Sequence, residues 1–532
     1  MHITFVTSEA IPWAKTGGLA DVCGALPAAI AAADPDTTVS VILPAYSSVY
    51  RADIPIEPTS LTFAVPLSDD EIVGGRLRHA VVGDPAVHFW FIDQPAYFHR
   101  DGLYGPPGDA YADNDKRFAF FTRAAIAAIG RLGVSGLNGG DPDPAAMPDV
   151  VHCHDWQSAT LPSIVRRDVA LRETFASTAT VLTIHNLAYQ GQFDVASFER
   201  LGLSWDHFHA DAMEFYGGVN FLKCGLVDAD HLTTVSPTYA VEICGDRFGC
   251  GLDGVLLSRR DALSGILNGI DDAVWNPADD PHLPMGYTVD NHRDGKHAAA
   301  VAVRGELGLP DAPEVPVLGL VGRLAEQKGW DLILPVIERH LRQDRPTQWA
   351  ILGSGDGRTE DALRQLRDEF PHALGIHIGF DEGLAHRIEA ASDLFVMPSH
   401  YEPCGLNQMY SMRYGSIPVV TPVGGLADTV IDLTDETSAD GTGTGFHLRS
   451  IDVDGLDEAI SRALHTRYHH GSTWNAMIRR GMTTDWSWRA SGKKYVDLYR
   501  SLPRHGPTSA RPSSAAQPAS RSGPAAPSYR RR

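Results

Sequence analysis

The chain has 532 residues, an apolar fraction of 43% and a formal net charge of -21. A chain of this length is too long for one hydrophobic core, so we expect at least two domains. The negative charge disfavours nucleic acid and anionic membranes as partners, and no apolar run is long enough to span a bilayer. The sequence leaves the oligomeric state open.

The two ends of the chain differ in character. Met1 leads directly into an apolar run without the basic segment and cleavage site of a secretory signal, so we expect a cytoplasmic protein. Residues 503–532 carry six Arg and no acid and are rich in Pro, Ser and Ala, so we expect a disordered tail. The six cysteines include no C-x-x-C pair, which favours reduced and mostly buried thiols.

The first part of the chain repeats a short β-branched run followed by a helical pattern, which predicts parallel βα units. The runs expected as strands include residues 3–6, 39–43, 150–152 and 181–184. After Leu19 the apolar positions Val22, Cys23, Leu26 and Ile30 recur at helical spacing. A helix is therefore predicted to begin at the Gly-Gly turn of residues 17–18 and to bury one face on the sheet.

A second series of βα units follows a boundary that we place near residue 263. It comprises a helix from about residue 296 to 307 and strands at 317–321, 349–352, 376–378, 394–397 and 419–420. We therefore predict an α/β protein of two doubly wound, Rossmann-like domains that face each other across a cleft. The domains span 1–262 and 263–485, and residues 486–502 form a helix that packs back on the first domain.

Candidate site residues follow the predicted strands, because open α/β sheets bind ligands at the carboxyl ends of their strands. Gly17 and Gly18 permit close approach of a phosphate to a helix N-terminus, and Lys15 adds a mobile cation. By itself this turn also fits a tight bend with a solvated Lys15, because short motifs have many false positives.

In the second domain, Arg323 and Lys328 lie five residues apart directly after a predicted strand. Two such cations are suited to clamp a pyrophosphate and to neutralise the charge that grows as it leaves. The alternative is a surface helix start with ordinary basic residues. Two more glycine-rich turns in the same domain, beginning at Gly353 and Gly424, favour the clamp.

Between those turns lies a loop that begins at Glu402, whose carboxylate is suited to hold sugar hydroxyls. The backbone N–H groups of Cys404, Gly405 and Leu406 are predicted to face an anion or a hydroxyl oxygen. A nucleophilic role for Cys404 is disfavoured because its local sequence offers no partner base.

In the first domain, His152, Cys153 and His154 invite a zinc hypothesis. We expect the two histidines to point to opposite faces at the strand end, and no matching cysteine pair exists, so no metal is predicted. His154 and Asp155 are preferred as hydrogen-bond partners of sugar hydroxyls, whereas His152 also fits a buried core histidine. An NAD-dependent oxidoreductase is disfavoured, because Gly-x-Gly-x-x-Gly is missing after the first strand and no acid ends the second.

In combination these segments resemble the bacterial glycogen synthase and plant starch synthase family from Met1 to about Leu502. The resemblance rests on Lys-Thr-Gly-Gly-Leu-Ala-Asp-Val (15–22), His-Asp-Trp (154–156), His-Asn-Leu-Ala-Tyr-Gln-Gly (185–191), Asn268-Gly269, Arg-Leu-x-x-Gln-Lys-Gly (323–329), Glu-Pro-Cys-Gly-Leu (402–406) and Gly-Gly-Leu-Ala-Asp-Thr-Val (424–430). It implies the GT-B fold and retaining transfer of glucose from ADP-glucose to the non-reducing end of an α-1,4-glucan such as glycogen. ADP is released, and neither a cofactor nor a metal is required.

The same resemblance implies roles for individual residues. Lys15 and Gly18 approach the donor phosphates or glucose, Arg323 and Lys328 the pyrophosphate, His154 the sugar, and Glu402 borders the glucose. Further donor contacts are implied for Gly17, Asp21, Asn268, Gly353, Phe380, Cys404, Gly405 and Leu406, with Phe380 against the adenine.

Two positions depart from related patterns. Tyr410 stands where the wider retaining group often has a second Glu, and Asn407 stands where the family often has Thr or Ile. UDP-glucose as donor and a non-catalytic glucan-binding protein remain the alternatives.

Overall fold

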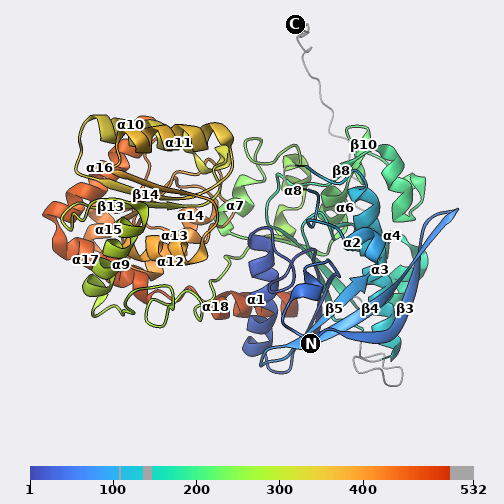
Figure 1. Cartoon of the computed structure of the whole chain (residues 1–532). Coiled ribbons are helices and arrows are strands. Elements are labelled where there is room, and N and C mark those ends of the chain that lie inside the picture. The colour runs from blue at the N-terminus through green and yellow to red at the C-terminus, as the bar shows by residue number, and fades with distance from the viewer. Residues whose placement is uncertain (107–108, 136–146, 504–532) are drawn as a thin grey trace, which may run out of the picture.

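The computed structural model describes residues 1–106, 109–135 and 147–503, which form two α/β domains side by side (Figure 1). The tail expected to be disordered lies outside the described residues from position 504 onward. Within the described part of the chain, no helix is long and apolar enough to cross a membrane.

The first domain is built on a sheet that has nine strands within the described residues, in the order β12-β11-β7-β6-β1-β2-β5-β4-β3. In chain order the strands are β1 (His2–Val6), β2 (Thr38–Pro44), β3 (Glu57–Ser68), β4 (Glu71–Val82), β5 (Val87–Asp93), β6 (Val150–His154), β7 (Ala179–Ile184), β11 (His231–Thr234) and β12 (Leu263–Gly265). Neighbours from β12 to β5 are parallel, and all four strands expected from the sequence in this domain lie in this parallel part.

The antiparallel hairpin β3–β4 at the edge of this sheet was not anticipated by the βα pattern. Along β3 the side chains of Phe63, Val65 and Leu67 are buried while those between them face solvent. This period of two is typical of an antiparallel strand with one wet face, which is a different signal from the continuous apolar runs of a parallel sheet.

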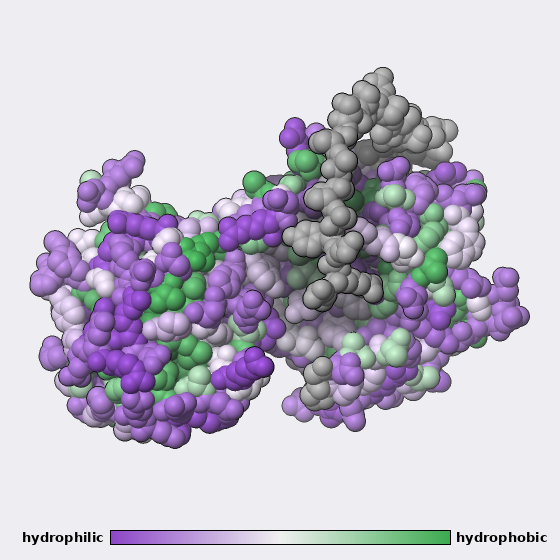
Figure 2. Space-filling view, turned by 90° about the horizontal axis from the view of Figure 1, so that it is seen from above, coloured by the Kyte–Doolittle hydropathy of each residue, from purple (hydrophilic) through white to green (hydrophobic). Residues whose placement is uncertain are grey.

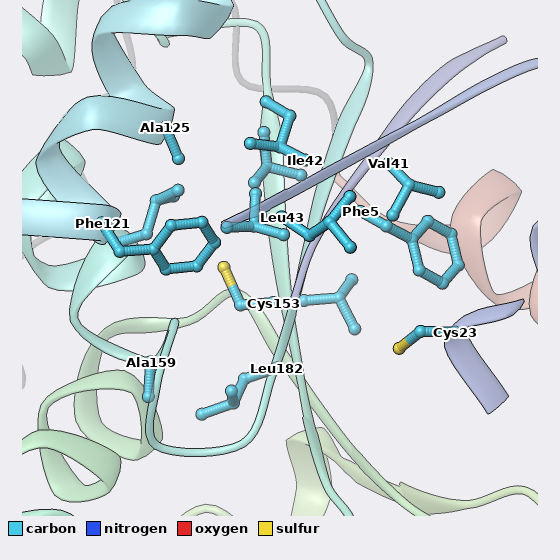
Figure 3. Packing of buried hydrophobic residues seen from close by; sticks show 14 of the residues in the cluster. Phe5, Cys23, Val41, Ile42, Leu43, Phe121, Ala125, Cys153, Ala159 and Leu182 are labelled. Atoms are coloured by element: carbon cyan, nitrogen blue, oxygen red, sulfur yellow. The ribbon is translucent and has the colours of Figure 1, made fainter. Parts of the chain in front are cut away.

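Helices cover both faces of the first sheet. They are α1 (Gly18–Ala33), α2 (Pro95–Phe98), α3 (Asn114–Ser135), α4 (Thr160–Arg167), α5 (Val169–Thr174), α6 (Phe221–Asp228), α7 (Pro237–Glu242) and α8 (Asp253–Ser258). In Figure 3, Cys153 lies beside Phe121 of α3 on one side of the strands, and Cys23 of α1 lies near Phe5 on the other. All six cysteines are free, and four of them are buried.

The second domain has a parallel sheet in the order β15-β14-β13-β16-β17-β18, a doubly wound arrangement. Its strands are β13 (Val317–Val321), β14 (Gln348–Gly353), β15 (Leu374–Ile378), β16 (Leu394–Met397), β17 (Ile417–Val420) and β18 (Phe446–His447). Its helices are α9 (His292–Leu307), α10 (Trp330–Arg342), α11 (Gly357–Glu369), α12 (Glu382–Ala391), α13 (Asn407–Arg413), α14 (Gly424–Thr429), α15 (Asp435–Ala439), α16 (Val453–His469) and α17 (Gly471–Thr483). The five strands expected in this domain coincide with β13 to β17.

Two segments cross between the domains, and they shift one predicted boundary. Because β12 pairs with β11, residues 263–265 belong to the first sheet, and the boundary lies after Gly265 rather than before residue 263. Beyond it, the N–H of Ile270 donates to the carbonyl of Trp486 at 2.8 Å. A methyl group on Gly269 would lie 2.5 Å from Trp488 Cα, so only glycine fits at this crossing.

The C-terminal helix α18 (Trp488–Ser501) returns to the first domain and lies beside α1 (Figure 1). The contact is close, since a methyl group on Gly492 would lie 2.8 Å from the carbonyl oxygen of Ala29. The hydroxyl of Tyr499 also lies 2.7 Å from Nδ1 of His152. The helix thus supports α1, whose N-terminus carries the Gly-Gly turn.

Candidate active site

The Lys-Thr-Gly-Gly turn wraps around a buried carboxylate that the sequence pattern did not reveal. Glu9, which follows β1, accepts hydrogen bonds from the N–H of Thr16 at 2.5 Å, from its hydroxyl at 2.6 Å and from the N–H of Gly17 at 3.3 Å. The hydroxyl of Tyr104 donates to the same carboxylate at 2.6 Å. Within the described residues no cation pairs with Glu9, so neutral donors alone stabilise this charge.

This arrangement occupies the N–H of Gly17 and leaves the space beside the turn open. The Gly17 N–H points at Glu9 and is not directed to a ligand, whereas Gly18 begins α1. A methyl group on Gly17 or Gly18 would meet no atom within 4 Å, so both glycines border open space. Lys15 is largely exposed and donates to Asp21 at 2.7 Å. The open space and the mobile cation are the features that a phosphate ligand requires of this turn.

His154 ends β6 among neutral histidines. Its Nδ1 lies 3.0 Å from Nε2 of His185, and its ring stacks on Phe5 with centroids 4.9 Å apart. Its Nε2 is buried and has no hydrogen-bond partner among the described residues. Burial holds the pKa of His154 well below its usual range and lowers that of His185 to about 3. A neutral imidazole with one open nitrogen is suited to bind a hydroxyl group.

The expectation that His152 and His154 point to opposite faces is wrong. Their ring centroids lie 4.2 Å apart, because residues two apart on a strand share one face. His152 contacts Tyr499 and the hydroxyl of Thr183, as a buried core histidine does. Among the described residues, no group of three His, Cys, Asp or Glu side chains has the arrangement of a metal site.

Asp155 holds the ends of two strands together. Its backbone has φ of 54°, an uncommon value for a residue other than glycine, and its carboxylate accepts from the N–H of His185 at 2.7 Å. Burial raises the pKa of Asp155 to about 7, and the charge of Glu9 adds to the effect. The carboxylate therefore positions the His154–His185 pair, and its oxygens are used on backbone groups rather than left for a sugar hydroxyl.

In the second domain, the sequence motifs that follow β13 and β16 meet. Lys328 Nζ donates to Glu402 Oε2 at 2.5 Å, and the hydroxyl of Ser399 donates to the same oxygen at 3.0 Å. The side chain of Arg323 is exposed and donates to Gln327 Oε1 at 3.2 Å. The clamp predicted from two cations therefore consists of one cation paired with a carboxylate and one that faces solvent.

The loop after Glu402 presents open backbone donors. In the part of the chain that the structure describes, no acceptor is hydrogen-bonded to the N–H groups of Cys404, Gly405 and Leu406. Gly405 has φ of 69°, which turns the loop into α13. Burial raises the pKa of the Cys404 thiol to about 12, which opposes a thiolate nucleophile. These N–H groups at a helix start favour an anion.

The second glycine pair at 424–425 supports this loop from behind. A methyl group on Gly424 would lie 2.0 Å from the carbonyl oxygen of Glu402, and one on Gly425 the same distance from that of Cys404. The N–H of Gly425 donates to the carbonyl of Glu402 at 3.1 Å. These glycines serve backbone packing, which differs from the expected Gly-rich ligand turn.

The remaining predicted donor residues lie at two strand ends of the second domain and at the crossing between the domains. Gly353 ends β14, where a methyl group would lie 2.1 Å from the carbonyl oxygen of Gly322, so it closes the strand ends tightly. Phe380, which follows β15, is 90% exposed, so its ring face is accessible to a ligand. Asn268 lies at the crossing between the domains with a buried, unpartnered Oδ1. Figure 2 shows from above that the surface is indented between the two domains.

Comparison with known proteins fits both halves of this site. A starch synthase catalytic domain model matches residues 2–258, and a glycosyl transferases group 1 model matches residues 309–481. A glycogen synthase of Rhodopirellula baltica is 50% identical over 94% of this chain and 97% of its own length. The chain belongs to the glycogen synthase and starch synthase family. It is a glycosyltransferase of glycogen or starch synthesis, which uses nucleotide-sugar and glucan substrates.

Other relatives agree with this family and its fold. A glycogen synthase of Anaeromyxobacter sp. is 46% identical over 94% of this chain and 99% of its own length. The catalytic domain of starch synthase IV from Arabidopsis thaliana superposes with a TM-score of 0.82 at 32% identity, over 94% of this chain and 98% of that chain. A sucrose-phosphate synthase at 16% identity and a TM-score of 0.54 shares the GT-B fold alone.

Sequence motifs alone missed Glu9, which fixes the Lys15 turn, and Tyr104, which donates to Glu9. His185, which orients His154, lies in the motif at 185–191. Glu9 follows an apolar strand with no motif of its own, but its position at a carboxyl strand end was a usable signal. Tyr104 lies in an irregular loop and carries no such signal.

Proposed function

We propose that this glycogen synthase family member transfers glucose from ADP-glucose to the non-reducing end of an α-1,4-glucan, with retention of configuration. The observation that carries the proposal is the Lys328–Glu402 pair beside the open N–H groups of residues 404–406. The starch synthase IV relative supports the choice of nucleotide, because its structure holds ADP and acarbose.

The reaction needs a leaving group that departs and an acceptor that attacks on the same face. The bond between C1 of glucose and the β-phosphate oxygen breaks, and a bond from C1 to O4 of the acceptor forms. The proton of the acceptor hydroxyl passes to the phosphate oxygen. Lys328, Arg323 and the three N–H groups stabilise the charge that grows on the phosphate, while Glu402 borders the glucose.

Lys15 and His154 complete the site from the first domain. Closure of the two domains brings Lys15 toward the donor phosphates and excludes water that would hydrolyse the donor. The buried Nε2 of His154, which has no partner among the described residues, then binds a sugar hydroxyl. A substantial rate of donor hydrolysis without acceptor would argue against such closure.

A coupled assay of nucleotide release with glycogen tests the donor. We expect turnover with ADP-glucose to exceed turnover with UDP-glucose, and equal or greater turnover with UDP-glucose would refute the assignment. No metal takes part in the proposed reaction, so protein treated with EDTA should keep its rate.

Lys328→Ala tests the leaving-group role. We expect kcat at saturating ADP-glucose to fall roughly 100-fold or more, because a positioned charge at the developing anion is lost. The control is Lys493→Ala, which changes a lysine on the exposed face of α18 and should keep the wild-type rate. Unchanged turnover in Lys328→Ala would remove this residue from the mechanism.

A further inference from the structure

The small sheet of the first domain ends in an unusual turn. Its strands are β8 (Gln192–Phe193), β9 (Glu214–Phe215) and β10 (Gly218–Asn220), and Gly218 pairs directly with Phe215. The two residues between them, Tyr216 and Gly217, have φ of 50° and 86°. Two positive φ values in a two-residue hairpin loop define a type I′ turn, which prefers Asn-Gly, Asp-Gly or Gly-Gly.

Local packing does not explain a tyrosine at this position. The side chain of Tyr216 is 87% exposed, so the residue gains almost no burial in exchange for its unfavourable backbone conformation. Its ring contacts that of Phe215 edge-on, with centroids 4.7 Å apart. The turn itself is fixed by the N–H of Gly217, which donates to Glu214 Oε1 at 2.6 Å. An exposed, strained residue of this kind points to a function.

The turn lies against a loop that leads to the site between the domains. A methyl group on Gly251 would lie 4.0 Å from Cε2 of Tyr216. The preceding residue, Cys250, accepts at its carbonyl from Gln190 Nε2 at 3.0 Å, which ties the loop to the segment that carries Tyr189. Tyr189 is itself 55% exposed.

The segment that carries Tyr189 begins at His185, whose Nε2 lies 3.0 Å from Nδ1 of His154 in the candidate active site. Burial raises the pKa of Tyr401, and the Tyr189 hydroxyl and the Cys250 thiol act on it in the same direction. Tyr401 directly precedes Glu402. The sequence of contacts from Tyr216 through the Cys250 loop therefore leads to the rim of the proposed transfer site.

We propose that Tyr216 and Tyr189, the tyrosine pair, bind the α-glucan acceptor chain outside the transfer site. The proposal rests on the proposed function for the identity of the glucan. A tyrosine ring offers an apolar face to the C–H groups of a glucose ring and a hydroxyl to its polar edge. The donor base has a separate candidate in Phe380, so the pair is assigned to the acceptor chain.

Tyr216→Asn separates binding from folding. Asparagine suits the first position of a type I′ turn, so the thermal midpoint should stay equal or rise. Glycogen affinity, measured by retardation in native gels that contain glycogen, should fall roughly two- to tenfold. The KM for glycogen should rise to a similar extent, while ADP affinity and kcat with saturating maltotriose stay unchanged. Tyr216→Phe should keep most of the affinity.

The control is Tyr468→Asn, since Tyr468 is a half-exposed tyrosine at the end of α16 in the second domain. It should bind glycogen as the wild type does. If Tyr216→Asn is as stable as the wild type and binds glycogen equally well, the proposal is overturned. Loss of ADP affinity in place of glycogen affinity would also overturn it. Because the gel assay needs no turnover, wild-type protein that binds glycogen without transferring glucose would contradict the proposed function and leave the tyrosine pair standing.

Discussion

Glu9 accepts hydrogen bonds from four neutral donors, three in the Lys15 turn and one on Tyr104. It is therefore a positioning residue for the proposed reaction. Glu9→Gln removes the charge that these donors stabilise. Because hydrogen bonds to a charged group contribute about 1.5–3 kcal/mol, we expect kcat/KM for ADP-glucose to fall roughly 10- to 100-fold. Tyr104→Phe removes one of the four hydrogen bonds to Glu9 and none of those from the turn. It should therefore lower kcat/KM for ADP-glucose much less.

A double-mutant cycle shows whether Glu9 acts through Lys15. In a Lys15→Ala background, Glu9→Gln should have little further effect, since the turn then carries no cation to position. Steady-state kinetics of the two single variants and the double variant provide the test. Fully additive losses would mean that Glu9 acts on the site by another route.

At the scale of elements, α10 and α16 of the second domain are joined mainly at one acidic residue, Asp457. Asp457 of α16 accepts from Arg345 at 2.5 Å and Arg339 at 2.9 Å and lies 3.0 Å from His340 Nε2. Burial raises the pKa of Asp457, but the hydrogen bonds from Arg345, Arg339 and His340 outweigh it and hold the pKa at about 2. The ordinary value is 3.8, so the folded state favours the charged form.

This shift predicts how stability depends on pH. A lowered carboxyl pKa stabilises the fold at all pH values above about 4, and this stabilisation is lost as the pH falls from about 4 to 2. Asp457→Asn should therefore lower the free energy of unfolding by about 2 kcal/mol at pH 7. The difference in thermal midpoint between variant and wild type should shrink toward pH 2.5.

Asp454→Asn on the same helix is the matched control. Asp454 is 87% exposed and contacts only Arg339 among these partners. Asp454→Asn should therefore lower the free energy of unfolding by no more than about 0.5 kcal/mol. A pH-independent loss in Asp457→Asn would show that packing and not the charge is responsible.

At the scale of the whole molecule, reciprocal hydrogen bonds join α7 of the first domain to α14 of the second. In each of them a carboxylate of one helix accepts from the N-terminal turn of the other. Asp428 accepts from the N–H of Thr238 at 2.9 Å and from its hydroxyl at 2.6 Å. Glu242 in turn accepts from the N–H of Gly424 at 3.1 Å. Each carboxylate lies at the N-terminal side of the partner helix, where free N–H groups favour negative charge. This reciprocal contact joins the two domains near the proposed site.

Asp428→Ala should weaken the contact between the domains. We expect the radius of gyration of the free protein, measured by X-ray scattering, to increase and the connecting segment after Gly265 to be cleaved faster by protease. Asp435→Ala, which changes an exposed acid of α15, should leave both unchanged. If the two variants behave alike, Asp428 does not hold the domains together.

The sequence by itself determined the parallel strands of the two large sheets, the start of α1 and the segments at the strand ends that carry the candidate site. These features depend on short-range patterns: continuous apolar runs, helical spacing after Gly18 and glycine or charged residues at strand ends. The same patterns do not detect β3 and β4, whose local signal is the alternation of buried and exposed side chains.

Only the tertiary structure decided which groups meet. Lys328 and Glu402 are 74 residues apart, and the Tyr104 hydroxyl reaches Glu9 across 95 residues, so no local spacing encodes these hydrogen bonds. The packing role of Gly424 against the Glu402 loop likewise depends on how distant strands and loops are brought together. Composition and spacing report the chemistry that is available, whereas burial and long-range contacts decide where each group is directed.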